Sequence, residues 1–227
     1  MSDLDFKLNI RRLVDEMFRL QIMFNNETNG EEWVNGVTKE GECIDWAVCI
    51  TQESAELIDS IPWKHWKDLS SKVDYDNILI ELVDIWHFVM SRVMEINKKG
   101  CSIELPLFVD RLVIVTSNII TEVRDTTAIP YSDNSKYVRK FMIDHVKKLI
   151  YVTLNEDASS EELLYAYFKL LYVVNSYAVN LNLPVMGIEE LYKLYIGKNG
   201  LNRVRQLNGY KSGEYNKLWV NDDGSLV

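Results

Sequence analysis

The residues with most chemical promise are two pairs of acids, Glu53 with Glu56 and Glu81 with Asp84, each pair three positions apart. Side chains at that spacing share one face of an α-helix. The second pair lies in a segment that is otherwise almost wholly apolar, NILIELVDIWHFVM. A buried carboxylate is costly unless a positive charge meets it. Two such pairs therefore indicate one shared cation site.

The alternative interpretation is that each pair belongs to the solvated stripe of an amphipathic helix. The chain has 34 acidic residues among 227, so roughly five acid pairs at this spacing are expected by chance. The setting argues against that interpretation for Glu81 and Asp84, because only His87 extends their polar stripe. A stripe that narrow is not typical of a surface helix.

Magnesium or manganese is the cation that this donor set favours. Hard cations prefer carboxylate oxygens and often share them with the phosphates of a substrate. Such ions can clamp a phosphoanhydride and prepare water for attack. A di-iron centre is the competing possibility, but it requires Glu-x-x-His on two helices. None of His65, His87 and His145 follows a glutamate by three positions.

A basic segment near the C-terminus contrasts with the net charge of −9 of the whole chain. Between positions 193 and 217 there is one acid, Glu214, and the basic residues are Lys193, Lys198, Arg203, Arg205, Lys211 and Lys217. Lys and Arg side chains with backbone amides can cradle phosphates. A solvated extension is the alternative, although interleaved aromatic residues favour a packed segment. No Walker A motif is present.

Two amide side chains, Gln21 and Asn25, lie four positions apart in the first amphipathic stretch. An amide presents a donor and an acceptor together, which suits the edge of a pyrimidine. Ordinary surface polarity is the alternative for this pair. Trp63 could stack on a base or pack against a core. No G-x-S-x-G nucleophile motif occurs.

Helical periodicity predicts the elements that position these residues. The expected helices span residues 6–24, 45–60, 75–97, 106–124, 136–154, 160–181 and 187–195. Residues 25–41 are expected to form a loop, and residues 197–219 a mixture of helix and loop. No sustained alternation of period two occurs, so no sheet is expected. The prediction is an all-α helical bundle with a carboxylate-lined metal site.

Composition bounds the class of protein. With 47% hydrophobic residues, ten Gly and four Pro, the chain is expected to fold as one domain over residues 1–227. No apolar stretch approaches the ~20 residues of a membrane span, and the first residues do not resemble a secretory signal. Three cysteines without metal-ligand spacing fit a reducing cytoplasm. The acidic balance argues against nucleic-acid binding.

Four segments carry a resemblance to a known family. They are LQIMFNNETNG (20–30), QESAELIDSIPWKHWK (52–67), IELVDIWHFVMS (80–91) and YIGKNGLNRVRQLNGYKSGEYNKLW (195–219). In this order they resemble the dimeric, all-α dUTPases, relatives of the all-α nucleotide pyrophosphatases. The resemblance implies an obligate homodimer that uses Mg²⁺, with Mn²⁺ as a possible substitute, to hydrolyse dUTP to dUMP and pyrophosphate. It implies that dUDP is accepted as well.

The resemblance also implies roles for individual residues. Glu53 would be the general base, and the metal ligands would be Glu53, Glu56, Glu81 and Asp84. The uracil pocket would be formed by Gln21, Asn25, Trp63 and His87. The 195–219 segment would bind the phosphates through Lys198, Asn202, Arg205, Tyr210 and Lys211.

Two other functions remain open from the sequence. A sister enzyme could cleave dCTP or a damaged nucleotide on the same scaffold, because an amide can turn over to present either donor or acceptor. A helical dimer could instead bind a nucleotide only to regulate a protein partner. The intact acid pairs argue against this second function, because binding alone does not require four carboxylates.

Overall fold

The computed structural model describes residues 3–69, 72–98, 105–126 and 135–210. In chain order its elements are α1 (Asp3–Asn29), η1 (Glu31–Asn35), α2 (Trp46–Asp59), α3 (Tyr75–Lys98), α4 (Leu105–Thr126), α5 (Ser135–Leu154), α6 (Ser160–Asn180) and α7 (Ile188–Leu207). The β-structure in these ranges is one isolated bridge between Val37 and Cys43. The predicted all-α fold is confirmed.

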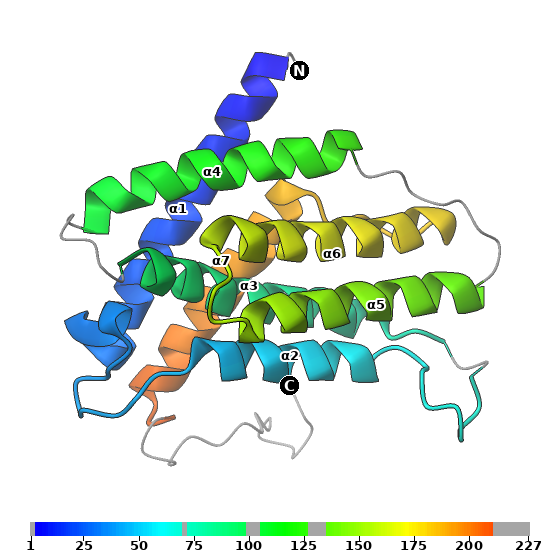
Figure 1. Cartoon of the computed structure of the whole chain (residues 1–227), viewed down its shortest axis with the longest axis horizontal. Helices are drawn as coiled ribbons and strands as arrows, with labels where there is room; N and C mark the ends of the chain where they lie inside the picture. The colour runs from blue at the N-terminus through cyan, green and yellow to red at the C-terminus, as the bar shows by residue number, and fades with distance from the viewer. Residues whose placement is uncertain (1–2, 70–71, 99–104, 127–134, 211–227) are drawn as a thin grey trace, which may run out of the picture.

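The helices form a bundle around α3. In Figure 1, α4, α6, α5 and α2 lie one below another, and α1 and α7 cross the view at a steep angle. Helix α3 packs against α2, α6, α1 and α7, and α5 packs against both α2 and α6. The two helices that carry the acid pairs, α2 and α3, are therefore direct neighbours.

One continuous core of buried side chains extends from α1 to α7. Trp86 of α3 is fully buried; its ring stacks on that of Tyr167 at 5.0 Å and meets that of Phe18 edge to face at 6.1 Å. The Tyr167 hydroxyl donates to the carbonyl of Leu82 over 3.0 Å. Burial of such large apolar side chains contributes about 1.5–3 kcal/mol each, so this packing fixes α3 against α1 and α6.

Local signals set the start of two helices. The Asp45 side chain accepts from the Val48 amide at the start of α2. Ser159 and Glu162 form a reciprocal capping box at the start of α6. Each such cap typically contributes about 1 kcal/mol. The cap of α2 at Asp45 lies eight residues before Glu53, and so helps to set which face carries the acids.

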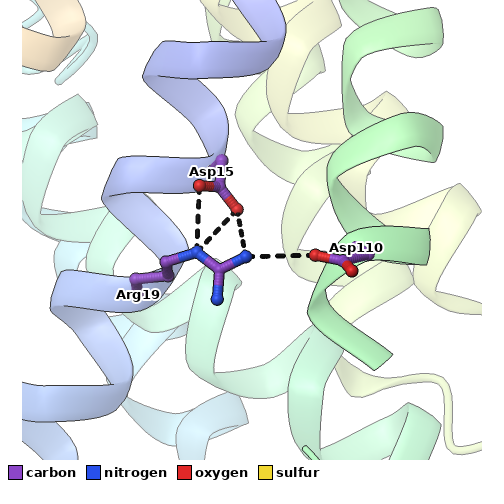
Figure 2. A network of polar contacts seen from close by, with 3 residues as sticks. All are labelled: Asp15, Arg19 and Asp110. Carbon is purple, nitrogen blue, oxygen red and sulfur yellow. Dashed lines mark hydrogen bonds and ion pairs between the residues drawn. The ribbon is translucent and has the colours of Figure 1, made fainter. Parts of the chain in front are cut away.

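A polar contact joins α1 to α4 at the surface. The Arg19 guanidinium donates to both carboxylate oxygens of Asp15 at 2.9 Å and reaches Asp110 at 3.1 Å (Figure 2). All three side chains are at least one third exposed, so the contact contributes at most about 1 kcal/mol. It orients α4 against α1 rather than holding the fold together.

Two helices extend further than the sequence predicts. Helix α1 continues through Asn29, and α7 continues through Gly197 and Gly200 to Leu207. The α7 residues Tyr195 and Asn199 are buried, and this packing offsets the helix cost of about 1 kcal/mol for each glycine. No helix in the described part of the chain is both long and apolar enough to cross a membrane.

Candidate active site

The acid pairs, the amides and the basic helix meet in one cavity of about 680 Å³. Its walls come from α1, the 43–45 segment, α2, α3 and α7. Nearly all of the residues that the sequence suggests for the site line this cavity: Gln21, Asn25, Glu53, Glu56, Glu81, Asp84, His87, Lys198, Asn202, Arg205 and Tyr210. Lys211 lies outside the described residues.

Three carboxylates converge at one end of the cavity. Glu53 from α2 and Glu81 and Asp84 from α3 each offer an oxygen, and these three atoms lie within 4.8 Å of one another. Glu56, one turn further along α2, is exposed at the rim, where it accepts from the Gln52 amide at 2.9 Å. Three of the four expected metal ligands therefore form the cluster, and Glu56 lines the same cavity.

The charges of the cluster repel one another. Burial, and then the charge of Asp84, raises the pKa of Glu53 to about 8. Burial also raises the pKa of Glu81, although Asn77 donates to its carboxylate at 3.1 Å. Carboxylates crowded in this way fit a hard divalent cation, which takes oxygen ligands and compensates their charge. The donor set therefore suits Mg²⁺ or Mn²⁺.

Lys198 of α7 contacts the cluster directly. Its ammonium lies 2.6 Å from Asp84, and the two side chains are 21% and 16% exposed. Burial raises the pKa of the Asp84 carboxyl, and the hydrogen bond from Lys198 opposes that rise. This ion pair fixes the basic helix beside the acids.

The basic residues of α7 divide between two directions. Lys198, Asn202 and Arg205 share the face towards the cavity, and Arg205 donates to Asn202 over 3.3 Å. Arg203 instead forms an ion pair with Glu27 at 3.0 Å. Lys193 is similarly paired with Glu190, at 3.4 Å. The basic composition of the segment thus overstates the number of cations that reach the site.

A buried group of polar side chains forms the other end of the cavity. Gln21 and Asn25 are each 2% exposed. The Gln21 amide nitrogen donates to Asn25 Oδ1 at 3.1 Å and to Ser91 Oγ at 3.2 Å, and the Asn25 amide nitrogen donates to Ser91 Oγ at 2.9 Å. Gln21 Oε1 lies 2.8 Å from His87 Nδ1 and 3.1 Å from the Tyr195 hydroxyl. The amide pair is therefore a fixed internal network.

The imidazole of His87 is held neutral. Burial, followed by the nearby charge of Lys198, lowers the pKa of His87 to about 3. Four buried polar atoms of this cavity have no hydrogen-bond partner within the described part of the chain: His87 Nε2, Trp46 Nε1, Thr28 Oγ1 and Arg205 Nε. Unpartnered buried polar atoms are uncommon in proteins. Their concentration here indicates that the cavity accommodates a polar ligand.

Trp63 does not join this group in the single chain. It lines a separate cavity of about 710 Å³ with Leu69 and Arg139, and its indole nitrogen donates to Asp59 at 3.2 Å. The physical reason is distance, because α2 continues for six residues after Glu53, at a rise of about 1.5 Å per residue, and Trp63 lies a further four residues beyond the helix end. The structure therefore separates Trp63 from the expected uracil pocket of its own chain.

Two residues of the network carried no prediction from the sequence, Ser91 and Tyr195. Ser91 is four positions after His87 and extends the stripe of Glu81 and Asp84, so its spacing was an available signal. The ring of Tyr195 packs 4.4 Å from that of His87. Its role depends on the packing of α7 against α1 and α3, for which the sequence has no local signal.

The fold and the cavity together define a class: all-α proteins in which a carboxylate cluster and basic side chains adjoin a buried polar pocket, as a nucleotide hydrolase requires. A family model described as dUTPase matches residues 13–210. The chain belongs to the dUTPase family, and dUTP diphosphatase activity is the function that this membership supports. No curated protein matches the chain.

Proposed function

We propose that the chain hydrolyses dUTP to dUMP and pyrophosphate in the cavity between α1, α2, α3 and α7, and that it also accepts dUDP. The single observation that carries the proposal is the shared cavity of about 680 Å³. It combines a carboxylate cluster, two inward basic side chains and a neutral polar pocket. These three parts match the cation, the phosphates and the base of a nucleotide.

The base would enter the pocket beside Asn25 and His87. The uracil edge offers a carbonyl acceptor next to an N–H donor. Asn25 can provide the complementary amide, and His87 Nε2 is buried without a partner in the described structure. Gln21 would hold these two groups in place through its bonds to both of them.

The phosphates would lie between the pocket and the acids, against α7. Lys198 and Arg205 would bind their oxygens with charge-assisted hydrogen bonds, and Asn202 and Tyr210 would contribute neutral ones. Lys198 would exchange its contact with Asp84 for one with the substrate. That exchange would free Asp84 to act as a metal ligand.

Glu53 would act as general base. It would accept a proton from the attacking water while the P–O bond between the α- and β-phosphates breaks and pyrophosphate leaves. Glu53, Glu81, Asp84 and, from the rim, Glu56 would hold Mg²⁺ or Mn²⁺. When bound, the cation would neutralise the crowded carboxylates and withdraw charge from the phosphoryl oxygens.

Three wider features belong to the same proposal. The 1–227 chain would form one domain, in agreement with its continuous core. It would act as a homodimer, in which Trp63 of the partner subunit would complete each site. A cytoplasmic location would suit the free Cys43 and Cys49.

Replacement of Glu53 by Gln tests the assignment of the base. The variant keeps the size of the side chain, so we expect turnover of dUTP to be abolished while the fold remains. Glu190→Gln, at a half-exposed position of α7 that is absent from the cavity lining, is the control and should turn over as wild type does. Substantial residual turnover in Glu53→Gln would contradict the assignment.

The same variant has a second readout that is independent of catalysis. Burial raises the pKa of Glu53 in the folded protein to about 8. Ionisation of Glu53 therefore destabilises the metal-free fold as the pH rises from the pKa of Glu53 in the unfolded chain to 8. Glu53→Gln should therefore raise the melting temperature of the metal-free protein at alkaline pH. Added Mg²⁺ should stabilise the wild type more than this variant.

A further inference from the structure

Ser91 of α3 is a buried polar residue behind the cavity. Its side chain is 0% exposed, and it is not among the described residues that line the cavity. Its Oγ nevertheless lies 2.9 Å from the Asn25 amide nitrogen and 3.2 Å from that of Gln21. Ser91 therefore contacts both amides from behind the surface that a ligand would touch.

The single proton of Ser91 is already committed. Its hydroxyl donates to the carbonyl of His87, one turn earlier in the helix, over 3.0 Å. Such a bond to the preceding turn is common for serine in helices. The oxygen can then only accept from other groups. Both amides must therefore present their NH₂ groups to Ser91, and neither can turn over without losing a buried hydrogen bond.

This orientation uses both N–H groups of Gln21. Its two N–H groups donate to Asn25 and Ser91. Its oxygen faces His87 Nδ1 and the Tyr195 hydroxyl, which lies 3.1 Å from this oxygen and 3.1 Å from the carbonyl oxygen of Met17. Gln21 consequently has no N–H group left for a ligand and acts as an organiser. Asn25 retains one N–H and one lone pair, because only half of its capacity is used.

The orientation also determines the tautomer of His87. Because Gln21 Oε1 is an acceptor, Nδ1 of His87 must carry the proton that lies between them, at a distance of 2.8 Å. A neutral imidazole has one N–H, so Nε2 is left as an acceptor. This is the buried ring nitrogen that has no partner in the described structure.

When N3 of the base faces His87 Nε2 and the 4-substituent faces the free N–H of Asn25, this pair of groups matches uracil and opposes cytosine. Uracil has an N3–H donor next to the O4 acceptor. Cytosine reverses both, with an unprotonated N3 next to an amino donor. We propose that Ser91 is a positioning residue for this selectivity, because its hydroxyl fixes which way the Gln21 and Asn25 amides face. The inference rests on the proposed function and adds to it the origin of the base preference.

The test compares Ser91→Ala with Ser117→Ala. Ser117 of α4 is also buried and also donates to the carbonyl one turn earlier, that of Val113. The control therefore removes the same kind of hydrogen bond, from a serine hydroxyl to a helix carbonyl, at a position outside the cavity lining. Ser91→Cys is the second variant, since it keeps most of the volume while weakening the acceptor, and it preserves the test if the alanine variant does not fold.

The first readout is kcat/KM for dUTP divided by kcat/KM for dCTP, measured for each protein. In the Ser91 variants we expect this ratio to fall by about tenfold or more. One or two buried hydrogen bonds hold the amides in the orientation found here, and their loss would let the amides turn over. The ratio for Ser117→Ala should equal that of wild type. A folded Ser91 variant with an unchanged ratio would overturn the inference.

The second readout is the nitrogen spectrum of the histidine rings in the protein without substrate. The chain has three histidines, so single replacements of His65 and His145 assign the signal of His87. We expect the Nδ1–H tautomer in wild type and a mixture of tautomers in Ser91→Ala. The Nε2–H tautomer in wild type would overturn the inference. This result does not depend on turnover, whereas a wild type that hydrolyses neither nucleotide would overturn the proposed function instead.

Discussion

The neutral state of His87 has a measurable consequence for stability in acid. Its pKa in the folded protein is about 3, whereas an unfolded histidine has a pKa of about 6.5. Between these values only the unfolded chain takes up the proton, so acid favours unfolding. The contribution of the neutral His87 to the free energy of unfolding is fully present above pH 6.5 and is lost as the pH falls towards 3. At pH 5 the loss amounts to about 2 kcal/mol, because each pH unit corresponds to about 1.4 kcal/mol.

His87→Asn isolates this contribution. The asparagine amide keeps a donor near the position of Nδ1, which contacts Gln21, but it does not titrate. Urea unfolding at pH 8 and at pH 5 gives the free energy of unfolding of each protein. Carboxylates contribute to both proteins alike and cancel in the comparison. The wild type should lose about 2 kcal/mol more than His87→Asn over this interval.

His65→Asn is the matched control, because His65 is exposed and lines neither the candidate active site nor the cavity at Trp63. Equal losses of stability in wild type and His87→Asn would refute the reasoning. They would mean that the buried imidazole accepts a proton without cost. Nε2 of His87 would then carry a proton in mild acid and would not act as an acceptor.

Two further predictions concern α7 and the loop before α2. Arg205→Ala should lower kcat/KM for dUTP by roughly 10–100-fold, as expected for the loss of charge-assisted bonds to a phosphate. Arg203→Ala is the control and should change kcat/KM little, because the Arg203 side chain is paired with Glu27. Equal effects of the two replacements in steady-state kinetics would remove Arg205 from the site. Gly200→Ala should raise the free energy of unfolding by roughly 0.5–1 kcal/mol, because a Cβ there meets nothing within 4 Å. Gly36→Ala should lower it, since Gly36 has a φ of 79° and Glu95 Oε1 lies 3.2 Å from the added carbon; thermal unfolding of both variants checks the opposite signs.

The carboxylate cluster could be predicted from the sequence because its geometry is local. The spacing of Glu81 and Asp84 places both on one turn of α3, whatever the rest of the fold does. Glu53 joins them because α2 packs on α3, a neighbourhood that two amphipathic helices in sequence often adopt. The position of Glu56 at the rim depends on the rotation of α2 and could not be derived in that way.

The polar pocket could be predicted only in part. Gln21 and Asn25 were marked by their spacing, but their orientation depends on Ser91 from α3 and Tyr195 from α7. These contacts join residues up to 174 positions apart. The periodicity of a single helix does not predict contacts between residues of different helices. The same limit explains Trp63, whose direction is set by the chain after α2 rather than by its own type.

The glycines of α7 show where propensity misleads. Gly197 and Gly200 favour an early helix end on local grounds. The structure continues the helix to Leu207 because Tyr195 and Asn199 are buried against α1 and α3. That continuation is functionally important, since Asn202 and Arg205 reach the cavity only as parts of a helix.

Pyrophosphate release tests the central claim most directly. Separate samples of dUTP, dCTP, dTTP and dATP would each be measured with Mg²⁺ and with EDTA. We predict fast release from dUTP alone, and its loss in EDTA. Equally fast release from dCTP would transfer the mechanism to a sister enzyme, and no release from any nucleotide would favour a binding module. Release from dUTP that persists in EDTA would contradict the assignment of the carboxylate cluster as a metal site.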